Sequence, residues 1–240
     1  MTKQLLLAGA AAMLAATTAS AVSQLPADGT IENYAIIATD MSGLHGGIQG
    51  RTGERTFTQK NGREGSFDLM RVDAYLGYDI VRWLTVYGFV GIADAKSDDF
   101  FELSEGDSKA TYGGGLWAAI VDDDQLDIME TFSRFRLNAG VEYAFTDANE
   151  LALGELEAFL TFELLNDTFL IHEMYPSSIG LFAGPIFSSV DMDGYEQDGD
   201  DAWGLTVGLS LTFSRRVYLN GGIDIFSDDH MVYASAGVRF

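Results

Sequence analysis

The last forty residues of the chain contain three runs in which apolar and polar side chains alternate, separated by two short turns. In the first run one side is entirely apolar and is made of Trp203, Leu205, Val207, Leu209, Leu211 and Phe213. Because successive side chains of a strand point to opposite faces, this alternation predicts a strand with one apolar face. The runs at 217–225 and 232–240 follow the same rule, so the chain is predicted to end in three antiparallel strands.

The same pattern recurs through most of the preceding sequence. Further strands are expected at about 44–59, 69–80, 84–92, 112–120, 135–145, 156–164 and 177–190. The segment 151–165 is rich in helix formers, but its strict alternation favours a strand. Which side of 177–190 faces inward stays open. The total is about ten strands, with eight or twelve as alternatives, and an even number places both ends of the chain on one side.

Runs of about ten alternating residues have the length that a tilted strand needs to cross a bilayer. The closing strand ends on Phe240, and this feature is similar to the C-terminal signature of bacterial outer-membrane barrels. The chain therefore resembles small outer-membrane β-barrel proteins of the porin-like and opacity-protein-like class. The resemblance implies an all-β fold, a single antiparallel up-and-down transmembrane β-barrel. It also implies contact with outer-membrane lipid, and with the barrel-assembly machinery through the C-terminal strand. It carries over no functional residue.

The N-terminus is consistent with export. Lys3 precedes a short apolar run, and Ala19-Ser20-Ala21 has the small residues of a cleavage site. We expect residues 1–21 to be a signal peptide and 22–240 the barrel domain. Residues 22–43 have no clear period. No later stretch has the roughly 18 apolar residues of a spanning helix, and the absence of cysteine excludes disulfides and thiolate chemistry.

The formal net charge of −22 argues against nucleic acid as a partner. The carboxylates gather between the apolar runs, chiefly at 98–109 and 191–201, where they are predicted to lie on solvated loops. No phosphate-binding glycine loop and no metal-spaced His/Cys cluster is present, so no cofactor is expected. The sequence does not indicate an oligomeric state.

Alternation alone does not decide which face of a barrel points inward. A soluble periplasmic binding barrel would bury the apolar face, whereas a membrane barrel exposes it to lipid. Charges of both signs on the polar faces favour a lumen lined by Arg71, Asp73, Arg134, Arg136, Glu142, Glu155, Glu157, Glu163, Asp224 and Arg239. Aromatic residues near strand ends are expected at the membrane interface, namely Trp83, Trp117, Trp203 and Phe240.

Two functions follow from such a lumen. The glycine- and threonine-rich polar faces could leave volume unfilled, and surplus carboxylates (Glu155, Glu157, Glu163, Asp224) would then line a narrow, cation-preferring, porin-like channel. The alternative is an internal Arg–carboxylate network that only stiffens a non-conducting structural or surface-binding barrel.

The sequence also contains candidates for a calcium site and for a catalytic site. Asp191, Asp193, Asp198 and Asp200 crowd one loop and are weak candidates for Ca²⁺ ligands, although their spacing departs from the EF-hand pattern. Barrel enzymes use a histidine near a carboxylate or a nucleophile. His45, His172 and His230 stand in no recognisable motif. We expect them to be solvated surface residues, and we expect no enzyme.

Overall fold

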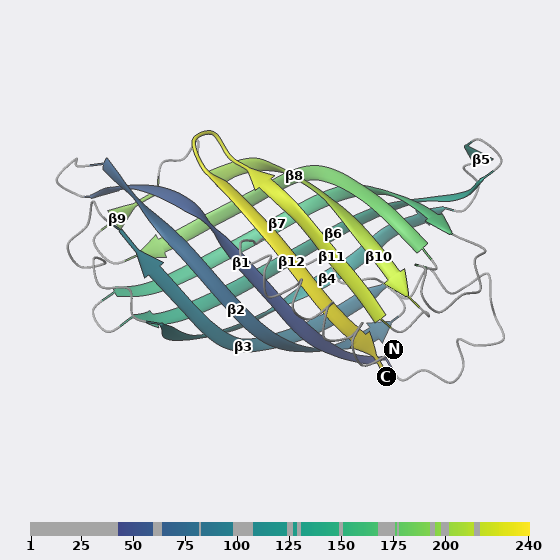
Figure 1. Cartoon of the computed structure of the whole chain (residues 1–240), viewed down its shortest axis with the longest axis horizontal. Coiled ribbons are helices and arrows are strands. Elements are labelled where there is room, and N and C mark those ends of the chain that lie inside the picture. The colour runs from purple at the N-terminus through teal and green to yellow at the C-terminus, as the bar shows by residue number, and fades with distance from the viewer. Residues whose placement is uncertain are drawn as a thin grey trace, which may run out of the picture.

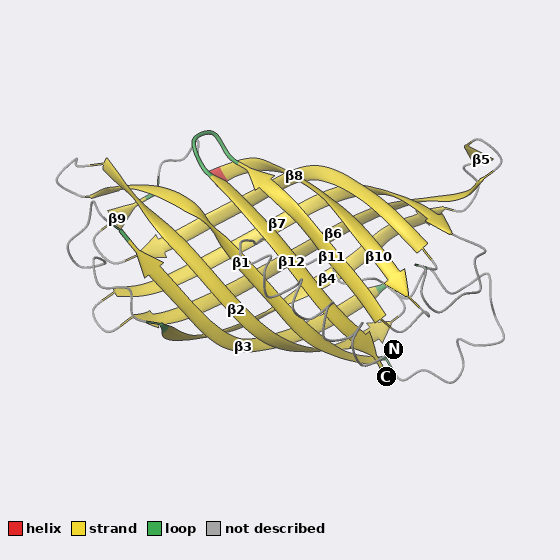
Figure 2. Cartoon of the chain, in the orientation of Figure 1, coloured by secondary structure: helices red, strands yellow, loops and turns green. Residues whose placement is uncertain are grey.

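A computed structural model describes residues 43–59, 64–81, 83–97, 108–123, 127–128, 131–148, 151–167, 176, 178–192, 195–197, 202–213 and 217–240. The predicted signal peptide, 1–21, and the segment 22–42 lie outside these residues. No helix among the described residues is long and apolar enough to cross a membrane. Figure 2 shows that the described chain is almost entirely strand.

Ten long strands close into one antiparallel barrel (Figure 1). They are β1 (Leu44–Gln59), β2 (Glu64–Val81), β3 (Leu84–Lys96), β4 (Lys109–Asp123), β6 (Thr131–Ala148), β7 (Leu151–Asp167), β8 (Ser178–Met192), β10 (Trp203–Phe213), β11 (Val217–Ile225) and β12 (His230–Arg239). Consecutive long strands pair with one another, and β12 returns to pair with β1. Two short strands, β5 (Asp127–Ile128) and β9 (Tyr195–Glu196), pair at the ends of the barrel. The predicted all-β, ten-stranded up-and-down barrel is confirmed, and 151–165 is a strand.

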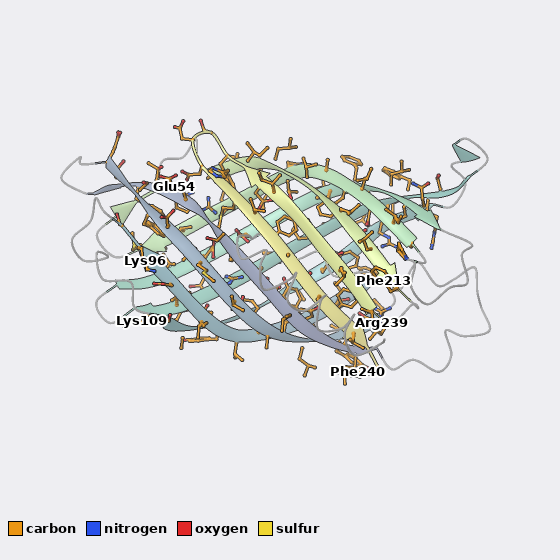
Figure 3. The ribbon with its side chains drawn as sticks, viewed as in Figure 1. Glu54, Lys96, Lys109, Phe213, Arg239 and Phe240 are labelled. Atoms are coloured by element: carbon orange, nitrogen blue, oxygen red, sulfur yellow. The ribbon has the colours of Figure 1, made fainter. Side chains whose placement is uncertain are left out.

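The barrel has two distinct ends. At the end we call the terminal end, β1 begins and β12 finishes, and the backbone N–H of Phe240 donates to the carbonyl oxygen of Leu44 (2.9 Å). Strands β3 and β8, which precede the two long acidic segments of the sequence, finish at the opposite end of the barrel, which we call the loop end. Figure 3 shows this polarity, with Lys96 and Lys109 at the loop end and Phe213, Arg239 and Phe240 at the terminal end.

The outer surface of the barrel is apolar and the inner surface carries the polar side chains. Val90 (65% exposed), Trp203 (63%) and Leu181 (61%) represent the outer face of three different strands. A soluble barrel that buries its apolar faces has the opposite arrangement. The open question of 177–190 is also answered, since Leu181 points outward while Phe182 is 2% exposed and points inward.

Of the four aromatic residues predicted at a membrane interface, Trp83, Trp203 and Phe240 are exposed on the outer surface. The expectation for Trp117 is wrong, because its side chain is only 1% exposed and lies inside the barrel. The alternation along β4 explains the error. Leu116 and Ile120 point outward, so Trp117, which directly follows Leu116, must point inward.

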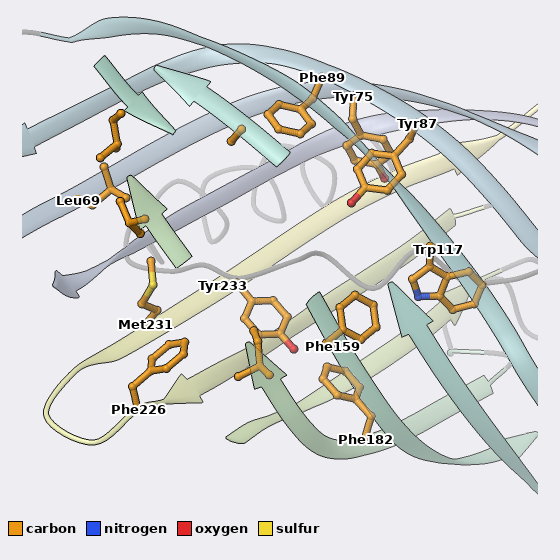
Figure 4. Packing of buried hydrophobic residues seen from close by; sticks show 14 of the residues in the cluster. Leu69, Tyr75, Tyr87, Phe89, Trp117, Phe159, Phe182, Phe226, Met231 and Tyr233 are labelled. Atoms are coloured by element: carbon orange, nitrogen blue, oxygen red, sulfur yellow. The ribbon is translucent and has the colours of Figure 1, made fainter. Parts of the chain in front are cut away.

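Inward aromatic residues lie directly across from glycines on the neighbouring strand. The pairs are Tyr75 with Gly47, Tyr87 with Gly115, Phe89 with Gly113, Phe159 with Gly140, Phe182 with Gly208, Tyr218 with Gly237 and Tyr233 with Gly222. A Cβ on each of these glycines would collide with its facing ring or hydroxyl. Figure 4 shows several of these rings gathered in the interior. The glycine-rich inner faces were expected to leave lumen volume unfilled, and this expectation is wrong where rings from the adjacent strands occupy the space.

Strand β8 carries a local irregularity. Pro185 lies in the middle of β8, and the pairing of β7 with β8 skips from Phe159↔Ile186 to Phe162↔Ala183. Proline has no N–H to donate to a ladder. Pairing with β10 continues through Leu205↔Pro185, so the barrel stays closed at this level.

The glycine–aromatic pairs make a direct prediction. Replacing Gly140 with Ala should destabilise the barrel by about 1–3 kcal/mol, because the new methyl group overlaps the ring of Phe159. Combining Gly140→Ala with Phe159→Leu should cost less than the sum of the two single changes. Urea unfolding of the folded barrel in lipid vesicles measures both.

Gly50 provides the matched control for this experiment. It points outward on β1, and the nearest atom to a Cβ there is the Arg71 carbonyl oxygen at 3.9 Å. Gly50→Ala should change stability by no more than about 0.5 kcal/mol. Equal losses at Gly140 and Gly50 would show that ring packing is not the reason for glycine at the inner positions.

Candidate functional site

The ten residues expected to line the lumen all lie on the inner face and are all buried, at 6% exposure or less. They are Arg71, Asp73, Arg134, Arg136, Glu142, Glu155, Glu157, Glu163, Asp224 and Arg239. They come from five strands, β2, β6, β7, β11 and β12. The structure gathers most of them into separate groups, of which the largest crosses the middle of the barrel.

The central group is built from like charges side by side. Arg51 on β1 lies directly across from Arg71 on β2, and Glu142 on β6 lies directly across from Glu157 on β7. Like charges at facing positions of neighbouring strands repel one another. Each pair therefore needs partners of opposite sign from elsewhere in the barrel.

Those partners are on the opposite wall. From β1 to β7 there are five steps through β2, β3, β4 and β6, and five steps through β12, β11, β10 and β8, so the two strands face each other across the barrel. The Arg51 guanidinium donates to Glu157 Oε1 (2.6 Å) and to Glu157 Oε2 (3.3 Å), and it also donates to Glu155. Side chains from two opposite walls thus meet across the lumen.

Arg71 reinforces this crossing. Its Nε donates to Asp73 Oδ2 (2.7 Å), its Nη1 donates to Glu155 Oε2 (3.2 Å), and its Nη2 donates to Glu142. Tyr87 donates to the second oxygen of Glu142 (2.8 Å). The result is a charge-assisted network in which the members support one another.

The same network extends toward the loop end. The Arg55 guanidinium donates to Ser188, lies 3.7 Å from Glu157 and stacks over the ring of Phe226 (4.4 Å to the centroid). Gln49 donates to Asp73 (3.2 Å). We call Arg51, Arg55, Arg71, Asp73, Glu142, Glu155 and Glu157 the central ionic layer.

Sequence reasoning missed Arg51 and Arg55, which are 3% and 0% exposed. The alternation of the first strand is obscured by glycine and threonine, so its inner face was not assigned. In the structure the odd-numbered positions of this strand point inward, since His45, Gln49, Arg51, Arg55 and Phe57 are all buried. With these arginines in place, Glu155 and Glu157 are paired rather than surplus.

A second group lies nearer the terminal end. Glu163 accepts hydrogen bonds from Asn138 Nδ2 (3.0 Å) and Ser210 Oγ (2.5 Å), and Arg136 lies 3.6 Å away. Arg134 lies on the same inner face of β6, two residues along. Glu163 is therefore a partnered residue as well. Asp224 is fully buried on β11, directly across from Thr206.

The histidines occupy different environments. His45 was expected at the surface and is 1% exposed, because it points into the lumen from the start of β1. The Tyr218 hydroxyl lies 3.3 Å from its Nδ1, and Asp79 lies 3.5 Å from its Nε2. His230 is exposed at the start of β12. His172 lies outside the described residues.

Three of the four candidate Ca²⁺ ligands, Asp193, Asp198 and Asp200, lie outside the described residues. The fourth, Asp191, is exposed near the end of β8. Within the described part of the chain, no group of three or more His, Cys, Asp or Glu side chains could hold a metal ion.

Comparisons with known proteins give little beyond the fold. No family model and no curated protein matches the chain. Among solved structures it is similar to the translocator domain of the autotransporter NalP from Neisseria meningitidis (11% identity, 88% of this chain and 95% of that chain covered, TM-score 0.34). It is also similar to the transport unit of the autotransporter AIDA-I from Escherichia coli (11%, 89% and 96%, 0.34) and to the monoaromatic hydrocarbon channel CymD (10%, 90% and 94%, 0.29). Similarity at this level supports no inference about function.

The central ionic layer makes a testable prediction about stability. Arg51→Met should cost about 3–5 kcal/mol, because it leaves buried carboxylates of Glu155 and Glu157 short of a partner. Adding Glu157→Gln should recover much of the loss, since one of the unpaired charges is then removed. Urea unfolding in vesicles is the measurement.

The exposed pair of Lys96 and Asp94 (3.0 Å) is the control. Lys96 is largely solvated, so Lys96→Met should cost less than about 1 kcal/mol. A loss at Arg51 no larger than that at Lys96 would mean that the network contributes nothing to holding the walls together.

Proposed function

We propose that this chain is an integral outer-membrane barrel of a diderm bacterium whose interior is closed to solutes. In this proposal it acts as a structural or surface-binding barrel rather than as an open pore. The apolar outer surface supports the location, because a continuous belt of exposed Leu, Val, Ile and aromatic side chains suits lipid and is costly in water. Strands that pair around a closed ring also leave no edge to be satisfied inside the bilayer.

The observation that carries the closed interior is the reach of Arg51 to Glu155 and Glu157 on the opposite wall. A solute that moved along the axis would have to break this contact between buried charges. Interior aromatic rings add a second obstruction on the terminal side, since Tyr75, Tyr87 and Phe159 are each 6% exposed or less (Figure 4). Narrow barrels can be filled by their own side chains, whereas aqueous channels are typical at about sixteen strands.

The exposed parts of the barrel suggest its partners. Phe240 is 60% exposed on the outer surface at the terminal end, and in this proposal the last strand would contact the barrel-assembly machinery during folding. The acidic connections at the loop end would face the cell exterior, and these are the segments that would bind Ca²⁺ or a basic partner.

A narrow, cation-preferring channel remains a second candidate. Among the described residues, the buried carboxylates number seven (Asp73, Glu142, Glu155, Glu157, Glu163, Asp224, Asp229) against six buried arginines. This small excess favours cations over anions if the central ionic layer opens.

The proposed location predicts how the outer face responds to charge. Leu209→Arg should cost about 2–4 kcal/mol of barrel stability, as an arginine on the lipid-facing side at mid-depth does. Leu209→Ala is the matched control and should cost less, since it keeps the face apolar. Unfolding in vesicles measures both, and the wild-type protein should be recovered from the outer-membrane fraction with heat-modifiable gel mobility. A protein free in the periplasm, or equal tolerance of Arg and Ala at Leu209, would end the membrane interpretation.

Planar-bilayer recording separates the two candidate functions. The folded wild-type barrel should be silent, and the triple variant Arg51→Ala, Glu155→Ala, Glu157→Ala should show openings because the cross-lumen contact is gone. Discrete cation-selective openings of the wild-type protein, weakened by Glu155→Gln with Glu157→Gln, would instead establish the channel.

A further inference from the structure

A group of side-chain contacts crosses the junction between the first and last strands. The barrel closes where β12 pairs with β1, over nine residue pairs from His45↔Arg239 to Gly53↔Met231. The neighbouring β1–β2 ladder has fifteen pairs. Every other long-strand pairing joins strands that follow one another in the chain, so the junction has the largest sequence separation and the largest loop-closure entropy.

Two tyrosines meet across this junction. Tyr75 on β2, Gly47 on β1, Gly237 on β12 and Tyr218 on β11 stand in one row, each directly across from the next. Because the two middle residues are glycines, the rings lean over them from either side. The Tyr75 hydroxyl then donates to the Tyr218 hydroxyl at 2.6 Å. Both rings are 5% exposed or less.

The glycines are required for this arrangement. A Cβ on Gly47 would lie 2.7 Å from the Tyr75 hydroxyl oxygen, and a Cβ on Gly237 would overlap the hydroxyl groups of both tyrosines. Any larger side chain at either position would fill the space in which the two hydroxyls meet. The hydrogen bond therefore depends on glycine at the facing positions of both junction strands.

A second contact crosses the junction one inward position nearer the terminal end. Arg239 on β12 reaches over β1 and donates from Nη2 to Asp79 Oδ2 on β2 (2.7 Å). His45 lies on β1 between them, with Tyr218 on one side of its ring and Asp79 on the other. The Thr85 hydroxyl also donates to Asp79 (2.5 Å), which fixes the carboxylate.

We propose that these residues form a lock that holds the barrel closed between its first and last strands. The contacts join β11 and β12 to β1 and β2 through side chains, in addition to the backbone ladder. They can form only after β12 has paired with β1 along this register, since the glycines must first face each other. The lock keeps the junction from parting sideways into lipid, so the barrel has no lateral opening there.

Amide hydrogen exchange of the folded barrel in vesicles tests the lock. In the double variant Tyr75→Phe, Tyr218→Phe, backbone amides of the β1–β12 ladder should exchange about five- to tenfold faster, as expected for the loss of one buried hydrogen bond. Amides of the β3–β4 ladder should be unchanged. Because the tyrosines act through one shared bond, the double variant should exchange no faster than Tyr218→Phe alone.

Tyr233→Phe is the matched control. Tyr233 is on β12 and rests against Gly222, and its hydroxyl lies 3.3 Å from Thr206 on β10, so it makes the same kind of contact without crossing the junction. It should leave exchange in the β1–β12 ladder unchanged. If the double variant does not assemble, Tyr75→Phe alone keeps the contact of Tyr218 with His45 and should still show faster exchange at the junction.

Three results would overturn the lock. They are unchanged exchange in the β1–β12 ladder, an equal rise in every ladder, or the same rise in Tyr233→Phe. Asp79→Asn provides an independent check, because it weakens the contact with Arg239 without changing side-chain size. It should speed exchange at the same junction.

Discussion

Closure of the sheet is the constraint on which the rest of this structure depends. Once β12 pairs with β1, every long strand has two neighbours and each residue has a fixed inner or outer direction. The outer direction receives most of the large aliphatic side chains, and the inner direction receives the arginines and most of the buried carboxylates. The interior must then satisfy a set of charges that no solvent surrounds, and it does so by pairing them across the lumen.

The central ionic layer follows from this constraint. Arg51 beside Arg71, and Glu142 beside Glu157, would each be unfavourable on an isolated sheet. The closed barrel brings the two pairs to opposite walls, where each neutralises the other. A contact of this kind stiffens the cross-section and obstructs the axis at once, which is why the geometry favours a closed barrel over an open pore. Buried ion pairs add little net stability against apolar residues of the same size, but removing one partner leaves an uncompensated buried charge.

Glycine has a similar double effect. In an isolated strand, glycine weakens pairing and offers no side chain to pack. In the barrel, a neighbouring ring covers each of seven inner glycines. Because a ring from one strand fills the space beside a glycine of the next strand, the small barrel has a packed interior without a large side chain at every position. At Gly47 and Gly237 it also lets Tyr75 and Tyr218 meet across the strand junction.

The sequence by itself indicated an all-β chain of about ten strands and, for most of them, which side chains share a face, because alternation with a period of two depends only on neighbouring residues. It also placed Arg71, Glu155 and Asp224 among the inner residues. It did not determine which charges pair, since Arg51 and Glu157 are far apart along the chain and meet only because ten strands close a ring. Nor did it show that His45 is buried, because glycine and threonine obscure the alternation of the first strand. Which charges meet depends on how the strands close into a ring, and only the tertiary structure brings residues of distant strands together.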